Sequence, residues 1–242
     1  MDTYIKPDYI VNMNFGGNIP EIPKIVYIFF YKSLIKKIES YFEFEKIKFT
    51  RGDLYIEKNK KFGIITNFGK GESESLMLAE ELSFMGVEKV ISIGAVGSLN
   101  SNLGIGDKIL IESAFSQIKI GEVYDFDKDE VYTNKSLNQK IKKSLIDSGI
   151  KFNSVKTLSV PTIYRETLEE IEKAKKKDIS VIEMEIFSLA MVFSLRNVEF
   201  SALGCVSDVL DSSKGWSFEA DFEKVFSSLS EIFLNIWDKI NN

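Results

Sequence analysis

The chain of 242 residues contains no histidine. This absence excludes a Ser-His-Asp or Cys-His catalytic system and any histidine-ligated metal site. A single cysteine, Cys205, excludes a disulfide within the chain and is typical of a cytoplasmic protein. Because its neighbours in sequence are mostly apolar, we expect Cys205 to be buried and unreactive. Any chemistry must therefore use carboxylates, hydroxyls, amides, lysine or arginine.

Long apolar segments are also missing. The longest apolar run, residues 25–31, is far too short to span a bilayer. The first residues lack the basic and apolar parts of a secretory signal, so we expect a cytoplasmic location without membrane association. A formal net charge of −5 and a pI near 5.1 argue against a surface for nucleic acid or anionic membranes.

The hydrophobic content of 44% is sufficient for a large core, and no linker or repeat divides the chain. We therefore predict one domain, residues 1–242. Strands alternate with helices, which predicts an α/β fold with a central mixed β-sheet flanked by helices on both faces. The expected strands are residues 25–31, 53–58, 61–68, 90–93, 108–116, 155–160, 181–184 and 200–207. The expected helices are residues 33–44, 73–85, 135–148, 166–177, 185–195 and 218–240, and residues 118–132 are expected to form an irregular loop.

Two acids, Glu183 and Glu185, flank Met184 where an apolar strand is expected to meet an apolar helix. Ligands of α/β proteins usually bind at such strand ends. A carboxylate there accepts two hydrogen bonds at once, which suits the paired hydroxyls of a sugar. The alternative is that both acids mark an exposed junction, because unpaired acids avoid buried positions.

Three segments together resemble the nucleoside phosphorylase family, which includes purine nucleoside phosphorylases, uridine phosphorylases and related nucleosidases. They are NFGKGES at residues 67–73, VEKVISIGAVGSL at residues 87–99 with GIGD at 104–107, and VIEME at 181–185 with VSD at 206–208. The ordered set is more specific than any one of these motifs alone. The resemblance implies the fold of that family. It also implies a homo-oligomer, either a dimer or a hexamer built of dimers, in which Arg51 and Tyr4 complete the site of a neighbouring subunit.

The resemblance also gives the acids their roles. Glu185 would bind the ribose hydroxyls, and Met184 would pack on the sugar. Asp208 would face the base and donate a proton to the leaving purine, because cleavage passes through an oxocarbenium-like sugar and leaves a base that must be neutralised. That role requires a raised pKa of Asp208. The alternative for Asp208 is an N-cap on the following turn.

Base recognition is implied for Ile163, Tyr164 and Ser207. The stretch at residues 159–165 resembles the base-stacking segment of the family, although Ile163 stands where an aromatic residue is usual, so that Tyr164 would take over the stacking. Uridine-specific members carry a glutamine and an arginine just beyond this segment. Thr167 and Glu169 occupy those approximate places here, which favours a purine over a pyrimidine.

The pattern fails at the phosphate site. The Gly-Asp-Pro-type loop of family phosphorylases and its downstream arginine are absent after the first strand. Arg51 matches a family ligand that a neighbouring subunit normally lends, and Gly71 and Ser92 are the other candidate ligands. Lys32 or Lys70 are alternative point charges, but neither has the fork of an arginine.

We therefore expect a small-molecule partner, a purine nucleoside, and cleavage of its N-glycosidic bond. The family default is phosphorolysis to the free base and ribose 1-phosphate, with inorganic phosphate as co-substrate and with no cofactor or metal. Hydrolysis by water is the alternative, although the N-terminal glutamate of that branch has no clear counterpart after residues 25–30. A third possibility is a non-catalytic nucleoside-binding protein or partner subunit.

Overall fold

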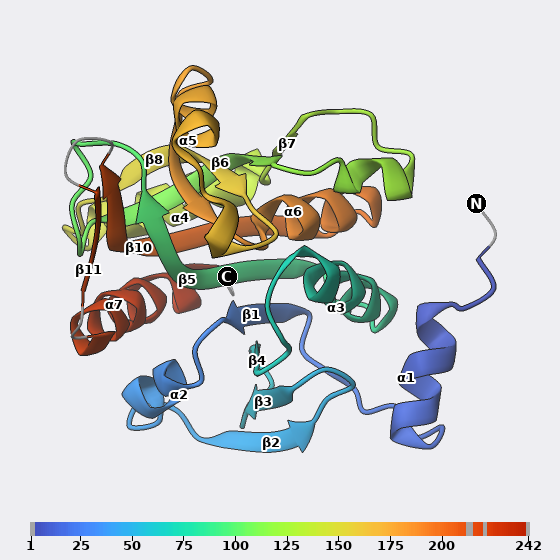
Figure 1. The fold of residues 1–242 in the computed structure, drawn as a ribbon. Helices are drawn as coiled ribbons and strands as arrows, with labels where there is room; N and C mark the ends of the chain where they lie inside the picture. The colour runs from blue at the N-terminus through green and yellow to red at the C-terminus, as the bar shows by residue number, and fades with distance from the viewer. Residues whose placement is uncertain (1–2, 212–214, 220–221, 241–242) are drawn as a thin grey trace.

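A mixed β-sheet runs through the computed structural model, which describes residues 3–211, 215–219 and 222–240 (Figure 1). The strands are β1 (Ile25–Phe29), β2 (Phe44–Lys48), β3 (Asp53–Glu57), β4 (Gly63–Thr66), β5 (Lys89–Ser98), β6 (Lys108–Ser116), β7 (Glu130–Tyr132), β8 (Asn153–Ser159), β9 (Ile179–Glu183), β10 (Glu199–Asp211) and β11 (Gly215–Phe218). The helices are α1 (Pro7–Phe15), α2 (Ser33–Ile38), α3 (Glu72–Phe84), α4 (Lys135–Asp147), α5 (Leu168–Lys175), α6 (Ile186–Leu195) and α7 (Phe222–Ile240), with short 3₁₀ helices η1 (Ile120–Tyr124) and η2 (Ile163–Arg165). The predicted α/β class is confirmed.

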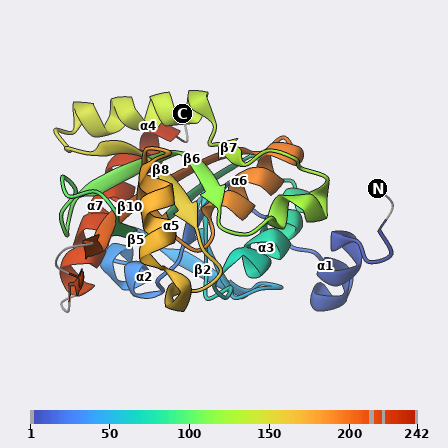
Figure 2. The ribbon, with the colours of Figure 1, turned by 45° about the horizontal axis from the view of Figure 1, so that its top comes forward.

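Helices cover both faces of the sheet, as the sequence predicts. On β1, Val26 and Ile28 pack into the layer that holds α3 and α6, whereas Tyr27 and Phe29 pack into the layer that holds α2, α4 and α7. This division follows from the alternation of side chains along a strand. Figure 2 shows α4 along one edge of the molecule, in contact with α7. Cys205 is buried in the second layer, as expected.

Part of the sheet closes on itself. In the described residues, β5 pairs with β10, β10 with β6, β6 with β8, β8 with β9, and β9 again with β5. Four further strands extend from β5 in the order β1, β4, β3, β2, while β11 pairs with β10 and β7 pairs with β6. The closure requires β5 to extend beyond the predicted strand at residues 90–93, because Gly97 and Ser98 pair with β9. β10 extends beyond the predicted residues 200–207, and residues 208–211 pair with β11.

Helix α1 lies where the sequence predicts no element, and three further segments differ from the sequence prediction. Residues 33–44, expected to form one helix, form α2 and then turn into β2, which pairs with β3. The last helix begins at Phe222 rather than at residue 218, because Gly215–Phe218 pair with β10 as β11. The expected loop at residues 118–132 contains η1 and β7. In each of these three segments, pairing with the strand that lies next to it along the chain overrides the local pattern.

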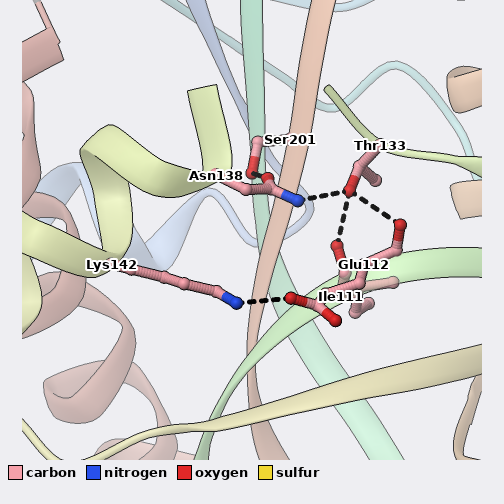
Figure 3. Close-up of polar contacts among 6 residues, drawn as sticks. All are labelled: Ile111, Glu112, Thr133, Asn138, Lys142 and Ser201. Carbon is pink, nitrogen blue, oxygen red and sulfur yellow. Dashed lines mark hydrogen bonds and ion pairs between the residues drawn. The ribbon is translucent and has the colours of Figure 1, made fainter. Parts of the chain in front are cut away.

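A buried polar network ties α4 to the sheet (Figure 3). Ser201 Oγ donates to Asn138 Oδ1 at 2.6 Å, and Asn138 Nδ2 donates to Thr133 Oγ1 at 2.8 Å. Thr133 Oγ1 in turn lies 2.8 Å from the carbonyl oxygen of Ile111 on β6. Because each buried polar atom has a partner, the network sets the position of α4 without the cost of an unsatisfied group.

No helix in the described part of the chain is both long and apolar enough to cross a membrane.

Candidate functional site

A cavity of about 510 Å³ opens where β5 changes its neighbour. β1 pairs with β5 as far as Ile93, and β9 pairs with it only from Gly97 onward. On this edge, the residues between them have no strand partner among the described pairings, so the ends of β1 and β9 diverge around them. Such a switch point is where open α/β sheets usually bind ligands.

Glycine makes room for the cavity walls on β5. A Cβ at Gly94 would lie 2.6 Å from Cδ2 of Phe30, and a Cβ at Gly97 would lie 3.0 Å from Oδ2 of Asp208. Both contacts are shorter than real side chains normally make, so the Phe30 ring and the Asp208 carboxylate depend on these glycines. This is a physical reason for the glycines of the GAVG segment.

The walls of the cavity carry many more acids than bases. Among the described lining residues, Lys70 is the sole lysine or arginine. The lining acids are Glu166, Glu183, Glu185 and Asp208. An anion that entered this cavity would therefore meet an unfavourable field, whereas a developing positive charge would be stabilised.

Glu183 is a structural carboxylate at the start of α6. Its Oε2 accepts the backbone N–H groups of Glu185 at 2.6 Å and Ile186 at 2.7 Å. Its Oε1 accepts Ser159 Oγ at 2.5 Å and Thr157 Oγ1 at 3.2 Å. Burial raises the pKa of Glu183, and these hydrogen bonds act in the opposite direction. Glu183 thus satisfies the free amides of the first helical turn.

Glu185 lies beside it, also buried, with 8% of its surface exposed. Its Oε1 accepts the backbone N–H of Gly71 at 2.7 Å. Burial, and then the nearby charge of Glu183, raise the pKa of Glu185 to about 7. The alternative of an exposed acidic junction is therefore wrong for both glutamates, because tertiary packing covers the strand end.

Asp208 lies within β10 and not at the start of a helix, so its N-cap alternative is also wrong. Its Oδ1 accepts Ser207 Oγ at 2.7 Å, and its Oδ2 accepts the indole N–H of Trp216 at 3.1 Å. The register between β5 and β10 shifts between Val206 and Asp208. This bulge turns Ser207 and Asp208 together toward the cavity, which both of them line.

The expected base-stacking residues are at the mouth of the cavity. Ile163 and Tyr164 belong to η2 and line the cavity, but their side chains are largely exposed. Met184 lines the cavity between the two glutamates. The structure therefore brings Met184, Glu185, Ser207, Asp208, Ile163 and Tyr164 to a single cavity.

The three expected phosphate ligands do not line it. Arg51 forms ion pairs with Glu74 and Glu81, each at 3.0 Å, and borders a separate cavity. Ser92 is fully buried within β5. The N–H of Gly71 is already used by Glu185. Thus Glu185 occupies the anion position at the start of α3 that a phosphate would otherwise take.

The alternative point charges differ from each other. Lys32 does not line the cavity, and its Nζ lies 3.7 Å from Oδ2 of Asp53. Lys70 lines it, with Nζ 5.6 Å from the centre of the Tyr31 ring. Burial raises the pKa of Tyr31, and the charges of Glu185 and Asp208 add to this effect.

Sequence reasoning missed Tyr31, Glu166 and Trp216, all of which line the cavity. The alternation of Trp216, Ser217 and Phe218 after Gly215 is a strand signal that would have placed two aromatics on one face. In the structure the two rings are stacked with centroids 4.7 Å apart. No comparable signal marks Glu166, which precedes α5 in a segment where several acids follow within the helix.

Within residues 3–211, 215–219 and 222–240, no group of three or more Cys, Asp or Glu side chains is arranged to hold a metal ion.

Comparison with known proteins places these features in a family context. The model of the phosphorylase superfamily matches residues 29–240. An uncharacterized protein, R802, of Acanthamoeba polyphaga mimivirus is 29% identical over 160 residues, which cover 65% of this chain and 61% of that protein, less than two thirds of its length. A DeoD-type purine nucleoside phosphorylase of Buchnera aphidicola is 24% identical over 185 residues, or 73% of this chain and 76% of that protein.

Solved structures share the fold at lower identity. The 5′-methylthioadenosine/S-adenosyl homocysteine nucleosidase of Campylobacter jejuni superposes with a TM-score of 0.77 at 18% identity, covering 90% of this chain and 99% of that one. The purine nucleoside phosphorylase of Toxoplasma gondii superposes with a TM-score of 0.77 at 16% identity, and the superposition covers 91% of each chain. The futalosine hydrolase of Helicobacter pylori superposes with a TM-score of 0.75 at 21% identity, covering 90% of this chain and 98% of that one. Phosphorylases and hydrolases thus share this fold.

Proposed function

The chain belongs to the phosphorylase superfamily, and we propose that it binds a purine nucleoside in the cavity at the β5 switch point and cleaves its N-glycosidic bond. In this proposal Glu185 accepts hydrogen bonds from the ribose hydroxyls, and Met184 packs on the sugar. Each carboxylate oxygen accepts more than one hydrogen bond, so the contact with Gly71 leaves acceptors for the sugar. Ile163, Tyr164, Ser207 and Asp208 surround the base.

The preference for a purine is supported by the residues that replace the pyrimidine-reading pair. The Thr167 side chain accepts a hydrogen bond from the Glu170 amide and caps α5. Glu169 pairs with Lys173 at 2.9 Å and is largely exposed. Neither residue lines the cavity, so neither is available to hydrogen-bond a pyrimidine there.

We further propose that water, rather than phosphate, is the nucleophile. The observation that carries this choice is the acid-rich cavity wall, in which Lys70 is the sole lysine or arginine among the described lining residues. Such a wall repels an anion and stabilises the positive charge of an oxocarbenium-like sugar. Once that charge develops, a weak nucleophile such as water is sufficient.

Phosphorolysis remains the second candidate because a specific feature favours it. Lys70 stands at the start of α3 inside the cavity and offers one positive charge to a phosphate. The sequence relatives named as purine nucleoside phosphorylases point in the same direction. Under this alternative, a neighbouring subunit would have to supply further cations.

The deciding experiment measures base release from adenosine, inosine and methylthioadenosine, each with and without inorganic phosphate. We expect release at the same rate in both conditions, with free ribose (or its methylthio derivative) as the sugar product. Release that requires phosphate and yields a sugar 1-phosphate would overturn the choice of water. If the nucleosides bind without base release, the non-catalytic alternative is correct.

We also propose that the protein forms a homo-oligomer. Near the N-terminus, the side chains of Tyr4, Ile5, Tyr9 and Met13 are largely exposed. Ile5 also lines the separate cavity that Arg51 borders. Sedimentation velocity would detect a dimer or larger assembly, and a monomer at micromolar concentration would contradict this proposal.

A further inference from the structure

Asp208 is already engaged as an acceptor on both of its oxygens. Ser207 Oγ donates to Oδ1, and the Trp216 indole N–H donates to Oδ2. These two hydrogen bonds hold the Asp208 carboxyl group in place. If the leaving base takes its proton from an acid in the cavity, a second acid is a better donor.

Glu166 is that second acid. It follows η2, directly after the segment that carries Ile163 and Tyr164, and lines the same cavity as Asp208. Among the described residues, no hydrogen bond or ion pair engages its carboxyl group, which is half-buried. The charge of Asp208 acts on it across the cavity.

We propose that Glu166, and not Asp208, is the general acid that protonates the departing purine. Asp208 then serves as the fixed acceptor that orients the base against Glu166. This assignment rests on the proposed cleavage of a purine nucleoside, but it does not depend on whether water or phosphate attacks the sugar.

The C1′–N9 bond breaks, and its electron pair moves into the purine ring. The proton of Glu166 is transferred to a ring nitrogen of the purine, which leaves as a neutral base. Water adds to C1′ through its oxygen and releases one proton to solvent, and the Glu166 carboxylate is reprotonated from solvent.

The surroundings of Glu166 favour its protonated form. Burial, and then the charge of Asp208, raise the pKa of Glu166 to about 7. At neutral pH a substantial fraction of the chains therefore carries the proton, as a general acid requires. The other titratable or charged groups that face the cavity or adjoin Glu166 are Tyr31, Lys70, Tyr164, Arg165, Glu183 and Glu185.

The test compares Glu166→Gln, Glu166→Asp and wild type on whichever purine nucleoside the wild type cleaves. Glu166→Gln should lower kcat about 10²- to 10⁴-fold, the usual contribution of general acid catalysis, with a much smaller change in KM. The wild type should lose activity as the pH rises through about 7, the pKa of Glu166. That alkaline loss should vanish in Glu166→Gln, and Glu166→Asp should restore part of kcat.

A nucleoside methylated at N7 provides a second readout. Its base is already cationic and leaves without protonation, so Glu166→Gln should cleave it at close to the wild-type rate. Glu169→Gln, at an exposed position on α5, is the matched control and should behave as wild type on both substrates.

The outcomes separate this assignment from the proposed function. If the wild type releases base but Glu166→Gln keeps its kcat and its alkaline loss, the assignment to Glu166 is overturned and the proposed function stands. If Glu166→Gln loses activity on the ordinary and the N7-methylated nucleoside to the same extent, the role of Glu166 is structural and the assignment is again overturned. If the wild type releases no base at all, the proposed function itself fails, and this assignment fails with it.

Discussion

The backbone amide of Gly71 donates a 2.7 Å hydrogen bond to Oε1 of Glu185. This single contact joins the N-terminus of α3 to the N-terminus of α6, although the two residues are 114 positions apart. It also places a carboxylate at the helix start where a phosphate would otherwise be bound. Under the role proposed for Glu185, this contact joins the ribose-binding carboxylate to the helix start that would otherwise bind an anion.

Glu185→Gln should impair turnover while the protein stays folded. Glutamine keeps an acceptor for the Gly71 amide but loses the charge that strengthens hydrogen bonds to the ribose. Hydrogen bonds to charged groups contribute about 1.5–3 kcal/mol, so kcat/KM should fall about 10- to 100-fold. Steady-state kinetics of base release would measure this, with the exposed Glu172→Gln as control. Unchanged kcat/KM would contradict the ribose assignment of Glu185.

Glu183→Ala should act on stability instead. The substitution leaves the amides of Glu185 and Ile186 and the hydroxyls of Ser159 and Thr157 without their acceptor. Loss of the cap together with unsatisfied buried groups should lower the free energy of unfolding by about 2–4 kcal/mol. Urea denaturation would show this as a lower midpoint. Glu183→Gln retains one acceptor oxygen, so its free energy of unfolding should fall less than that of Glu183→Ala. A urea midpoint for Glu183→Ala equal to that of the wild type would refute the capping role.

Gly97→Ala should displace the Asp208 carboxylate. The new methyl group would meet Asp208 Oδ2 at 3.0 Å and Ile182 Cγ2 at 2.9 Å, so one of them must move. Small displacements of groups at a reacting centre cost about 10- to 100-fold in rate, and we expect a loss of that size in kcat/KM. Gly104→Ala is the control, because a Cβ at Gly104 meets nothing within 4 Å. Equal activity of the two variants would argue against the need for close approach at Gly97.

Stability should decrease as the pH rises from about 4.5 to about 7. Glu72 is 4% exposed, and its Oε1 accepts Ser116 Oγ at 2.8 Å. Burial, and then the charge of Glu183, raise its pKa from 4.5 to about 7. In this window the folded chain holds a proton that the unfolded chain has released, so the free energy of unfolding falls with rising pH. Burial also raises the pKa values of Glu166 and Glu185 to about 7, so these two acids add to the same loss of stability.

The measurement is urea denaturation at several pH values for the wild type and Glu72→Gln. The variant lacks the titrating group, so its stability should fall less steeply between these pH values. Hydrogen bonds from Lys46 and Asn67 lower the pKa of Asp53, and hydrogen bonds from Ser113 and Lys156 lower that of Glu130, in each case against the effect of burial. The stability that these two acids contribute is lost only at lower pH. Parallel curves for the two proteins would show that Glu72 does not titrate as stated.

The predicted elements are most accurate where local signals are strong. β6 has the predicted bounds of Lys108–Ser116, and α4 begins at the predicted residue, where the Asn134 side chain caps it. The closed part of the sheet was not predictable in this way. It depends on pairing of β5 with β10 and β9, and such long-range pairing leaves no periodic signal at Gly94–Gly97, where the glycines indicate a loop.

The candidate site shows the same division. Met184, Glu185, Ser207 and Asp208 could be proposed from motifs, and the structure brings them to one cavity. Glu166 and Trp216 could not, because they come from segments whose approach to Asp208 is set by η2 and by the pairing of β11.

Residue type and local order are enough to establish the α/β class, the family resemblance and the chemistry available in a chain without histidine. The tertiary structure decided which acids are buried, which donors they bind and which charges share a cavity. Burial and the proximity of distant segments set the pKa values of Glu166 and Glu185 and commit the Gly71 amide to a carboxylate. These properties arise only when segments far apart in the sequence pack together.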